Sequence, residues 1–173
     1  MKENFYNNPL KIIWKSKSNL MPNYLYAIWI LFVLISLTGA TFFDFMDFSS
    51  FQIGTYFSVS STGLTLTLAL FVAGKNAFSE EELKRLATHK KNSKAVQGQA
   101  LIDFLGPFVF TALLFLITGL LSLFGPYINL PLKKEYVEII KVIFINILFL
   151  GLLSLFNLVI TMLNDVYASA FRK

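Results

Sequence analysis

The sequence predicts an all-α integral membrane protein, a bundle of four transmembrane helices with both termini in the cytoplasm. Four apolar stretches of about 20 or more residues are each long enough to cross a hydrocarbon core of roughly 30 Å. They run from about 24–43, 53–74, 104–124 and 139–163. Apolar residues make up 55% of the chain and charged residues 14%, far from the balance of a soluble domain.

The basic residues sort onto one side of these stretches when the chain is threaded alternately through a bilayer. Only Lys133, Lys134 and Lys141, 3 of the 15 Lys and Arg, fall on the other side. The remaining 12 are Lys2, Lys11, Lys15, Lys17, Lys75, Lys84, Arg85, Lys90, Lys91, Lys94, Arg172 and Lys173. The positive-inside bias assigns their side to the cytoplasm, so we expect a multi-pass membrane protein with both termini and the central loop on that side.

At 173 residues the chain is expected to form a single four-span membrane domain over 1–173. The net charge of +5 fits lysines and arginines that meet anionic lipid headgroups beside the spans. We therefore expect membrane lipids as partners and no direct binding of nucleic acid.

Residues 1–23 precede the first span and combine apolar with basic side chains. The apolar ones recur at helix-like spacing and are Leu10, Ile13, Trp14, Leu20 and Met21, with Lys11, Lys15 and Lys17 between them. A short helix in the headgroup layer, anchored by Trp14, is one interpretation. A cytoplasmic lead without fixed structure is the other, and both stay open.

The first outer loop, about 42–52, alternates five phenylalanines with Asp44 and Asp47. Carboxylates are too costly to desolvate deep in hydrocarbon, so this loop is expected to lie at the interface with its rings inward. A docking surface for an external ligand or partner is the alternative.

The central loop, 75–103, predicts a short cytoplasmic helix from about 80 to 92 between the second and third spans. Ser79 and Glu82 have the spacing of a capping box, and Glu80 stands four residues before Lys84. We expect its basic residues to dock a soluble cytoplasmic protein, and they are Lys84, Arg85, Lys90, Lys91 and Lys94.

The second span carries small and hydroxylated residues on one helical face. They are Gly54, Ser58, Ser61, Thr62, Thr65, Ala69 and Ala73, flanked by Ser60, Gly63 and Thr67. Such faces allow close approach of helices, within the bundle or between subunits, and the alternative is a hydroxyl-lined polar path.

Weaker polar stripes follow the other spans. The fourth span has Asn146, Ser154, Asn157, Thr161, Asn164 and Asp165, and the third has Asp103, Pro107, Thr111, Thr118 and Ser122. Because a buried amide must be paired, Asn157 is expected to face protein or water, as a helix-packing or pore-lining residue.

Catalytic and metal-binding patterns are absent from the sequence. His89 is the single histidine and the chain has no cysteine, which excludes His/Cys metal sites and a cysteine nucleophile. No P-loop or dinucleotide fingerprint is present. We expect no enzyme activity and no cofactor.

Two functions remain. One is a homo-oligomeric sensor or scaffold that couples to a soluble cytoplasmic partner, and the other is an oligomeric ion-conducting pore, since a single four-helix bundle has little lumen.

In size and layout the chain resembles the membrane subunit of the bacterial Kiwa antiphage defence system. The matching features are the four spans, the cytoplasmic segment Ser79–Lys94 and the short tail ending in Arg172 and Lys173. The resemblance implies a homo-oligomeric inner-membrane sensor that holds a cytoplasmic, DNA-binding partner. It implies no functional residue, because no motif is shared.

Overall fold

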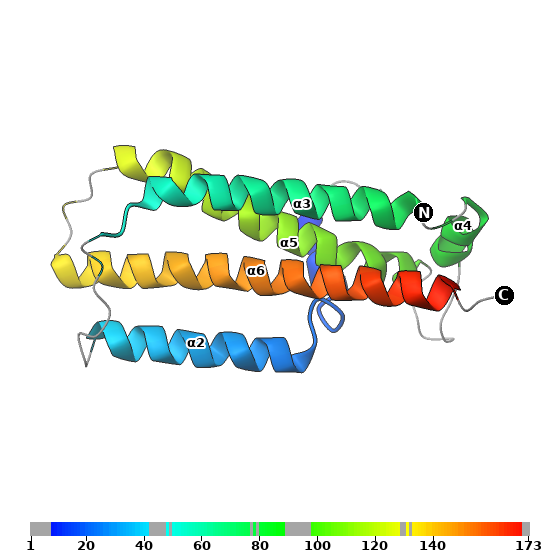
Figure 1. Ribbon diagram of the computed structural model, residues 1–173, viewed down its shortest axis with the longest axis horizontal. Coiled ribbons are helices and arrows are strands. Elements are labelled where there is room, and N and C mark those ends of the chain that lie inside the picture. The colour runs from blue at the N-terminus through cyan, green and yellow to red at the C-terminus, as the bar shows by residue number, and fades with distance from the viewer. Residues whose placement is uncertain are drawn as a thin grey trace.

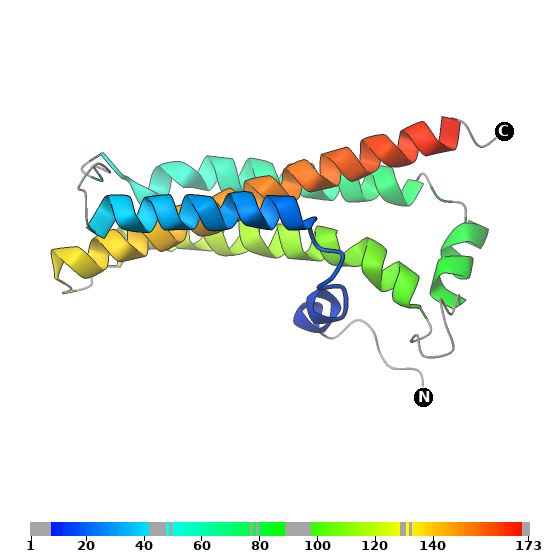
Figure 2. The same ribbon diagram turned by 90° about the horizontal axis from the view of Figure 1, so that it is seen from below.

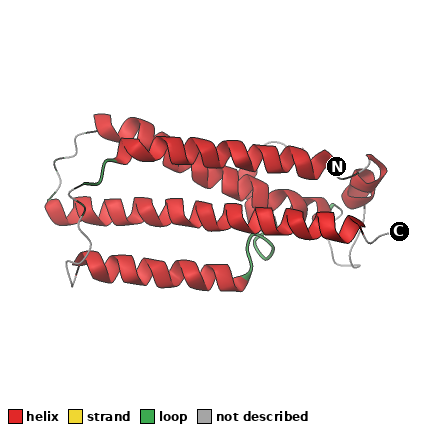
Figure 3. Ribbon diagram, viewed as in Figure 1, coloured by secondary structure: helices red, strands yellow, loops and turns green. Residues whose placement is uncertain are grey.

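The computed structural model describes residues 8–41, 48, 50–76, 78, 80–88, 98–128, 131 and 133–170. Over these ranges all regular secondary structure is helical (Figure 3), and four helices are long and apolar enough to cross a membrane. The α-helices are α1 (Pro9–Lys15), α2 (Asn23–Thr41), α3 (Tyr56–Asn76), α4 (Glu80–Thr88), α5 (Gln99–Phe124) and α6 (Lys134–Ala170). Short 3-10 turns, η2 (Ile53–Thr55) and η3 (Gly125–Tyr127), precede α3 and follow α5. Over the described residues, the prediction of an all-α fold with four helices long and apolar enough to cross a membrane is confirmed.

Two of the helices are longer than the apolar stretches that predicted them. α5 begins at Gln99 rather than near residue 104, and α6 continues from Lys134 to Ala170, beyond the predicted 139–163. Hydropathy detects only the part of a helix that suits hydrocarbon, whereas the backbone continues its hydrogen bonding into the polar layer. At 1.5 Å per residue, the 37 residues of α6 extend about 55 Å.

The long helices form an open arrangement around α6. α2, α6 and α3 lie next to one another, and α5 packs behind α3 and α6 (Figures 1 and 2). α3 contacts both α5 and α6, whereas the main contact of α2 is with α6 alone. α5 and α6 diverge toward the end that carries α4 (Figure 2). One side of α3 and most of α2 are therefore left uncovered by the chain itself.

The core is centred on Phe115 of α5, which is 1% exposed and packs with Phe144 and Leu148 of α6. Two glycines make room for its ring. A Cβ atom added to Gly63 of α3 would overlap the ring, and one added to Gly151 of α6 would lie 3.3 Å from it. The Phe115 ring thus contacts both α3 and α6, because Gly63 and Gly151 have no side chain in its way.

Within the described part of the segment before the first span, Pro9–Lys15 form a helix, α1, while its place in the headgroup layer stays a prediction. The start of α1 carries an N-cap signal, which the prediction from apolar spacing did not consider. The Asn8 side chain accepts a hydrogen bond of 3.0 Å from the Leu10 N–H, and Pro9 follows as the first helical residue.

Candidate interaction surfaces

The face of the second span predicted to pack or to line a path is mostly uncovered within one chain, although Ser58 and Thr62 border α6. Its members Gly54, Ser58, Ser61, Thr62, Thr65 and Ala69 are all exposed. Two of its hydroxyls bond to the backbone of their own chain segment, Thr65 to the Ser61 carbonyl at 2.9 Å and Ser58 to the Thr55 carbonyl at 3.3 Å. Most of this face is therefore uncovered within one chain, and its packing, within the bundle or between subunits, and the polar path stay predictions.

The flanking residues of α3 make the contacts inside the chain instead. Ser60, Gly63, Thr67 and Gly74 are buried. The Ser60 hydroxyl donates a hydrogen bond of 2.9 Å to the Thr118 hydroxyl of α5, which itself bonds to the Leu114 carbonyl. The inner face of α3 thus combines close approach with one polar link between helices.

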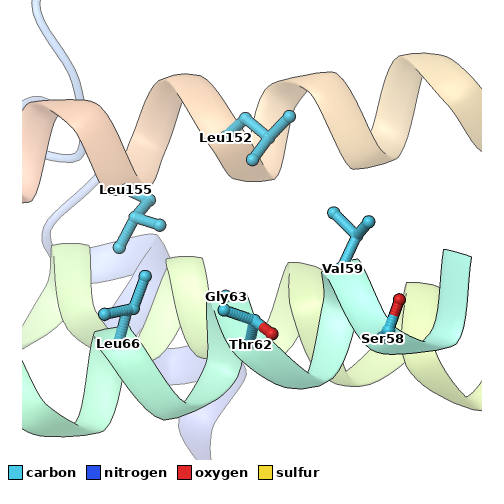
Figure 4. Close-up of a pocket in the computed structure, with 7 residues that line it drawn as sticks. All are labelled: Ser58, Val59, Thr62, Gly63, Leu66, Leu152 and Leu155. Atoms are coloured by element: carbon cyan, nitrogen blue, oxygen red, sulfur yellow. The ribbon is translucent and has the colours of Figure 1, made fainter.

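A groove of about 290 Å³ runs between α3 and α6 beside the exposed face. It is lined by Ser58, Val59, Thr62, Gly63, Leu66, Leu152 and Leu155. Figure 4 shows the apolar side chains of both helices projecting into the space between them. The groove is mainly apolar, with the hydroxyl-bearing Ser58 and Thr62 on its α3 side.

The polar residues predicted on the third and fourth spans lie mostly inside the bundle. Thr111 of α5 and Ser154 of α6 are buried and share a hydrogen bond between their hydroxyls. Asn146 of α6 is 6% exposed and donates to the Ser36 hydroxyl of α2 at 2.8 Å. The amide oxygen of Asn146 has no hydrogen-bond partner among the described residues.

Asn157 is half-buried and donates a hydrogen bond of 3.3 Å to the Leu20 carbonyl, in the turn between α1 and α2. Its amide therefore faces protein, as the cost of an unpaired amide in hydrocarbon requires. Together with Asn146 it ties α6 to the N-terminal part of the chain at two levels.

The basic surface expected to dock a partner is described only in part. Lys84 and Arg85 of α4 are exposed, while Leu86 and Ala87 on its other side are half-buried where α4 lies against α5. Lys90, Lys91 and Lys94 lie outside the described residues, as do Ser79 and the Glu82 side chain of the predicted capping box.

The sequence interpretation missed the role of Lys141, which it counted only as a charge on the outer side. Its ammonium donates a hydrogen bond of 3.1 Å to the Phe48 carbonyl and lies 5.5 Å from the centre of the Phe51 ring. A lysine within an otherwise apolar span was the available signal, since such a charge requires a partner nearby. Here it attaches the start of α6 to Phe48, in the segment between α2 and α3.

The chain thus has the layout of a multi-pass helical membrane protein, with an uncovered hydroxylated face on α3 and a basic α4 at one end of the bundle. Compared with known proteins, it matches no protein-family model, no curated protein and no solved structure. The class follows from its helices alone.

Proposed function

We propose that this protein is a non-enzymatic scaffold or sensor of the bacterial inner membrane that assembles with copies of itself and binds a soluble cytoplasmic protein. Both termini and α4 then lie in the cytoplasm, in keeping with the distribution of Lys and Arg. We extend the proposal to an antiphage defence role like that of the Kiwa membrane subunit. Its expected partner is accordingly a cytoplasmic DNA-binding protein.

The observation that carries this proposal is the exposed small-residue face of α3. In lipid, helices associate through close van der Waals packing and hydroxyl contacts rather than through a hydrophobic driving force. Ser58, Ser61, Thr62, Thr65 and Ala69 meet both requirements and are uncovered within one chain. The adjoining groove between α3 and α6 offers space for the side chains of a neighbouring helix.

Replacing Ser58, Ser61 and Thr65 together by Leu tests the assembly. Three bulky side chains would hold a second copy away, so we expect the mass in mild detergent or nanodiscs to fall to that of one chain, measured by light scattering. The matched control is Thr38→Leu with Thr161→Leu. Both of these threonines are exposed on other helices and bond to their own backbone, at 2.8 and 2.9 Å.

An assembly that survives the α3 substitutions, or a wild-type protein that is a single chain in nanodiscs, would contradict self-association through α3. Loss of assembly in the control as well would show that any added bulk disrupts it.

The basic surface of α4 is tested by charge reversal. Lys84→Glu and Arg85→Glu, combined with the same change at Lys90 and Lys91, should abolish co-purification of the soluble partner. The control is Lys133→Glu, an exposed lysine near the start of α6, at the other end of the bundle. A partner identified by mass spectrometry that stays bound to the reversed variant and to the control would remove α4 as its docking surface.

The exposed hydroxyls of α3 also favour a second function, an ion-conducting pore built from several subunits. Four hydroxyl side chains along one face, Ser58, Ser61, Thr62 and Thr65, would supply a polar lining. Planar-bilayer recording separates the two functions. A pore requires unitary currents that Ser61→Leu reduces, whereas a scaffold gives none above the lipid baseline.

A further inference from the structure

The short helix α1 is fixed crosswise on the flank of the bundle. It lies behind α5 in Figure 1 and is seen nearly end-on in Figure 2, so its axis runs across the long helices. Ser16, directly after α1, is fully buried against Gly106 of α5, where an added Cβ would overlap it. The Gln99 amide of α5 donates a hydrogen bond of 3.1 Å to the Lys15 carbonyl. α1 is thus attached to the membrane domain at its C-terminal end.

The level of α1 along the bundle coincides with the start of the apolar spans. On α5, Gly106 lies two residues from Phe104, whose ring is 3.4 Å from the position of a Cβ on Gly74 of α3. The apolar part of α3 ends there, since Lys75 follows. α2 begins at Asn23, shortly after the buried Leu20 and Met21. If these apolar ends mark one boundary of the hydrocarbon, α1 lies near that boundary, and its crosswise axis runs parallel to the membrane plane.

The outward surface of α1 and the turn after it combines large apolar side chains with ammonium groups. Trp14 is 73% exposed and Leu10 is 61% exposed. The Lys17 ammonium lies 5.1 Å from the centre of the Trp14 ring, and Lys11 is exposed one residue after Leu10. Rings and aliphatic chains at this level favour the region just below the headgroups, while ammonium groups favour the phosphates.

We infer that α1 and Lys17 form a docking site for anionic phospholipid headgroups. Leu10 and Trp14 insert among the upper acyl chains, and Lys11 and Lys17 bind the phosphates. Charge complementarity favours an anionic lipid over a zwitterionic one, and the crosswise orientation presents the whole surface to one leaflet. This inference requires neither self-association nor a soluble partner, so it stands or falls separately from the proposed function.

Quenching of Trp14 fluorescence by brominated lipids tests the site in the full-length protein. The chain has one other tryptophan, Trp29, so subtracting the spectrum of Trp14→Phe from that of the wild type isolates Trp14. The protein is reconstituted in phosphatidylcholine vesicles containing a minority of phosphatidylglycerol, with either one or the other lipid brominated at the same depth. We expect quenching per brominated lipid to be about fivefold stronger for phosphatidylglycerol, the factor that one lysine contributes near an anionic surface.

Lys11→Gln with Lys17→Gln should remove this preference and retain quenching by both lipids, whereas Lys133→Gln at the other end of the bundle should keep the preference. Equal quenching by the two lipids in the wild type would overturn the anionic specificity. Quenching by aqueous iodide with none by either lipid would overturn membrane contact altogether.

Discussion

The two faces of α3 have nearly the same composition and opposite environments. The inner face carries Ser60, Gly63, Thr67 and Gly74 and is buried, whereas the outer face carries Ser58, Ser61, Thr62, Thr65 and Ala69 and is exposed. Hydroxyls occur on both, and both have the spacing of a helical stripe.

The two faces of α3 differ in the side chains that lie opposite them. On the inner face Gly63 receives the ring of Phe115 and Gly74 receives the end of Met162. On the outer face, the chain provides only the rim of the groove with α6. Small residues therefore determine a contact only where a bulky side chain lies opposite, and within one chain most of the outer face has none.

Gly63→Ala is expected to have the largest effect on this comparison. The added methyl group would overlap the Phe115 ring. The ring has little room to move away, because its other side lies 3.3 Å from the position that a Cβ atom of Gly151 would occupy. Overpacking of this kind typically costs about 1–3 kcal/mol. Unfolding in mixed micelles of detergent and SDS should show a loss of stability in that range.

A second substitution makes this prediction specific. Phe115→Leu shortens the ring and should be less destabilising in the Gly63→Ala background than in the wild type, because the two side chains compete for the same space. Additive losses in the double variant would mean that Gly63 is required for another reason.

Ser60→Ala should have a smaller effect than Gly63→Ala, but larger than that of Ser61→Ala next to it. The Ser60→Ala variant lacks the hydrogen bond to Thr118, although Thr118 still donates to the Leu114 carbonyl. Interhelical hydrogen bonds in membranes contribute about 0.6 kcal/mol on average and at most about 1.7. The exposed Ser61 should lose less than about 0.5 kcal/mol when single chains are unfolded under the same conditions. Equal losses of unfolding free energy at Ser60 and Ser61 would mean that the two faces contribute equally to the stability of one chain.

The comparison also explains how far the sequence determines this fold. The four spans are predictable because the length of an apolar stretch is a local property, and bilayer thickness sets its lower limit. The orientation of α3 about its axis is not local. Ser, Thr and Gly at intervals of three and four residues describe two adjacent stripes, and the stripe that turns inward depends on where Phe115 and Thr118 stand on another helix.

A similar limit applies to α1 and to Lys141. The cap formed by Asn8 and Pro9 predicts a helix start from sequence, but the attachment of α1 depends on Gly106, about 90 residues further along the chain. Lys141 in an apolar span indicates a required partner, and that partner is a backbone carbonyl, Phe48, which no side-chain pattern identifies. In both cases the contacting residue lies about 90 residues away along the chain.

Gly74→Ala is the smallest effect expected on the inner face, and it tests whether a partner's rigidity decides the cost. The added methyl group would overlap the terminal methyl of Met162, the far end of an unbranched and flexible side chain. Met162 can change rotamer at little cost, and alanine favours a helix over glycine by up to about 1 kcal/mol. The net change in unfolding free energy should therefore lie within about 0.5 kcal/mol of zero. A loss as large as that of Gly63→Ala, measured in the same micelles, would show that the whole inner face is equally intolerant. The contrast between a confined ring and a movable methionine would then no longer explain how α3 packs.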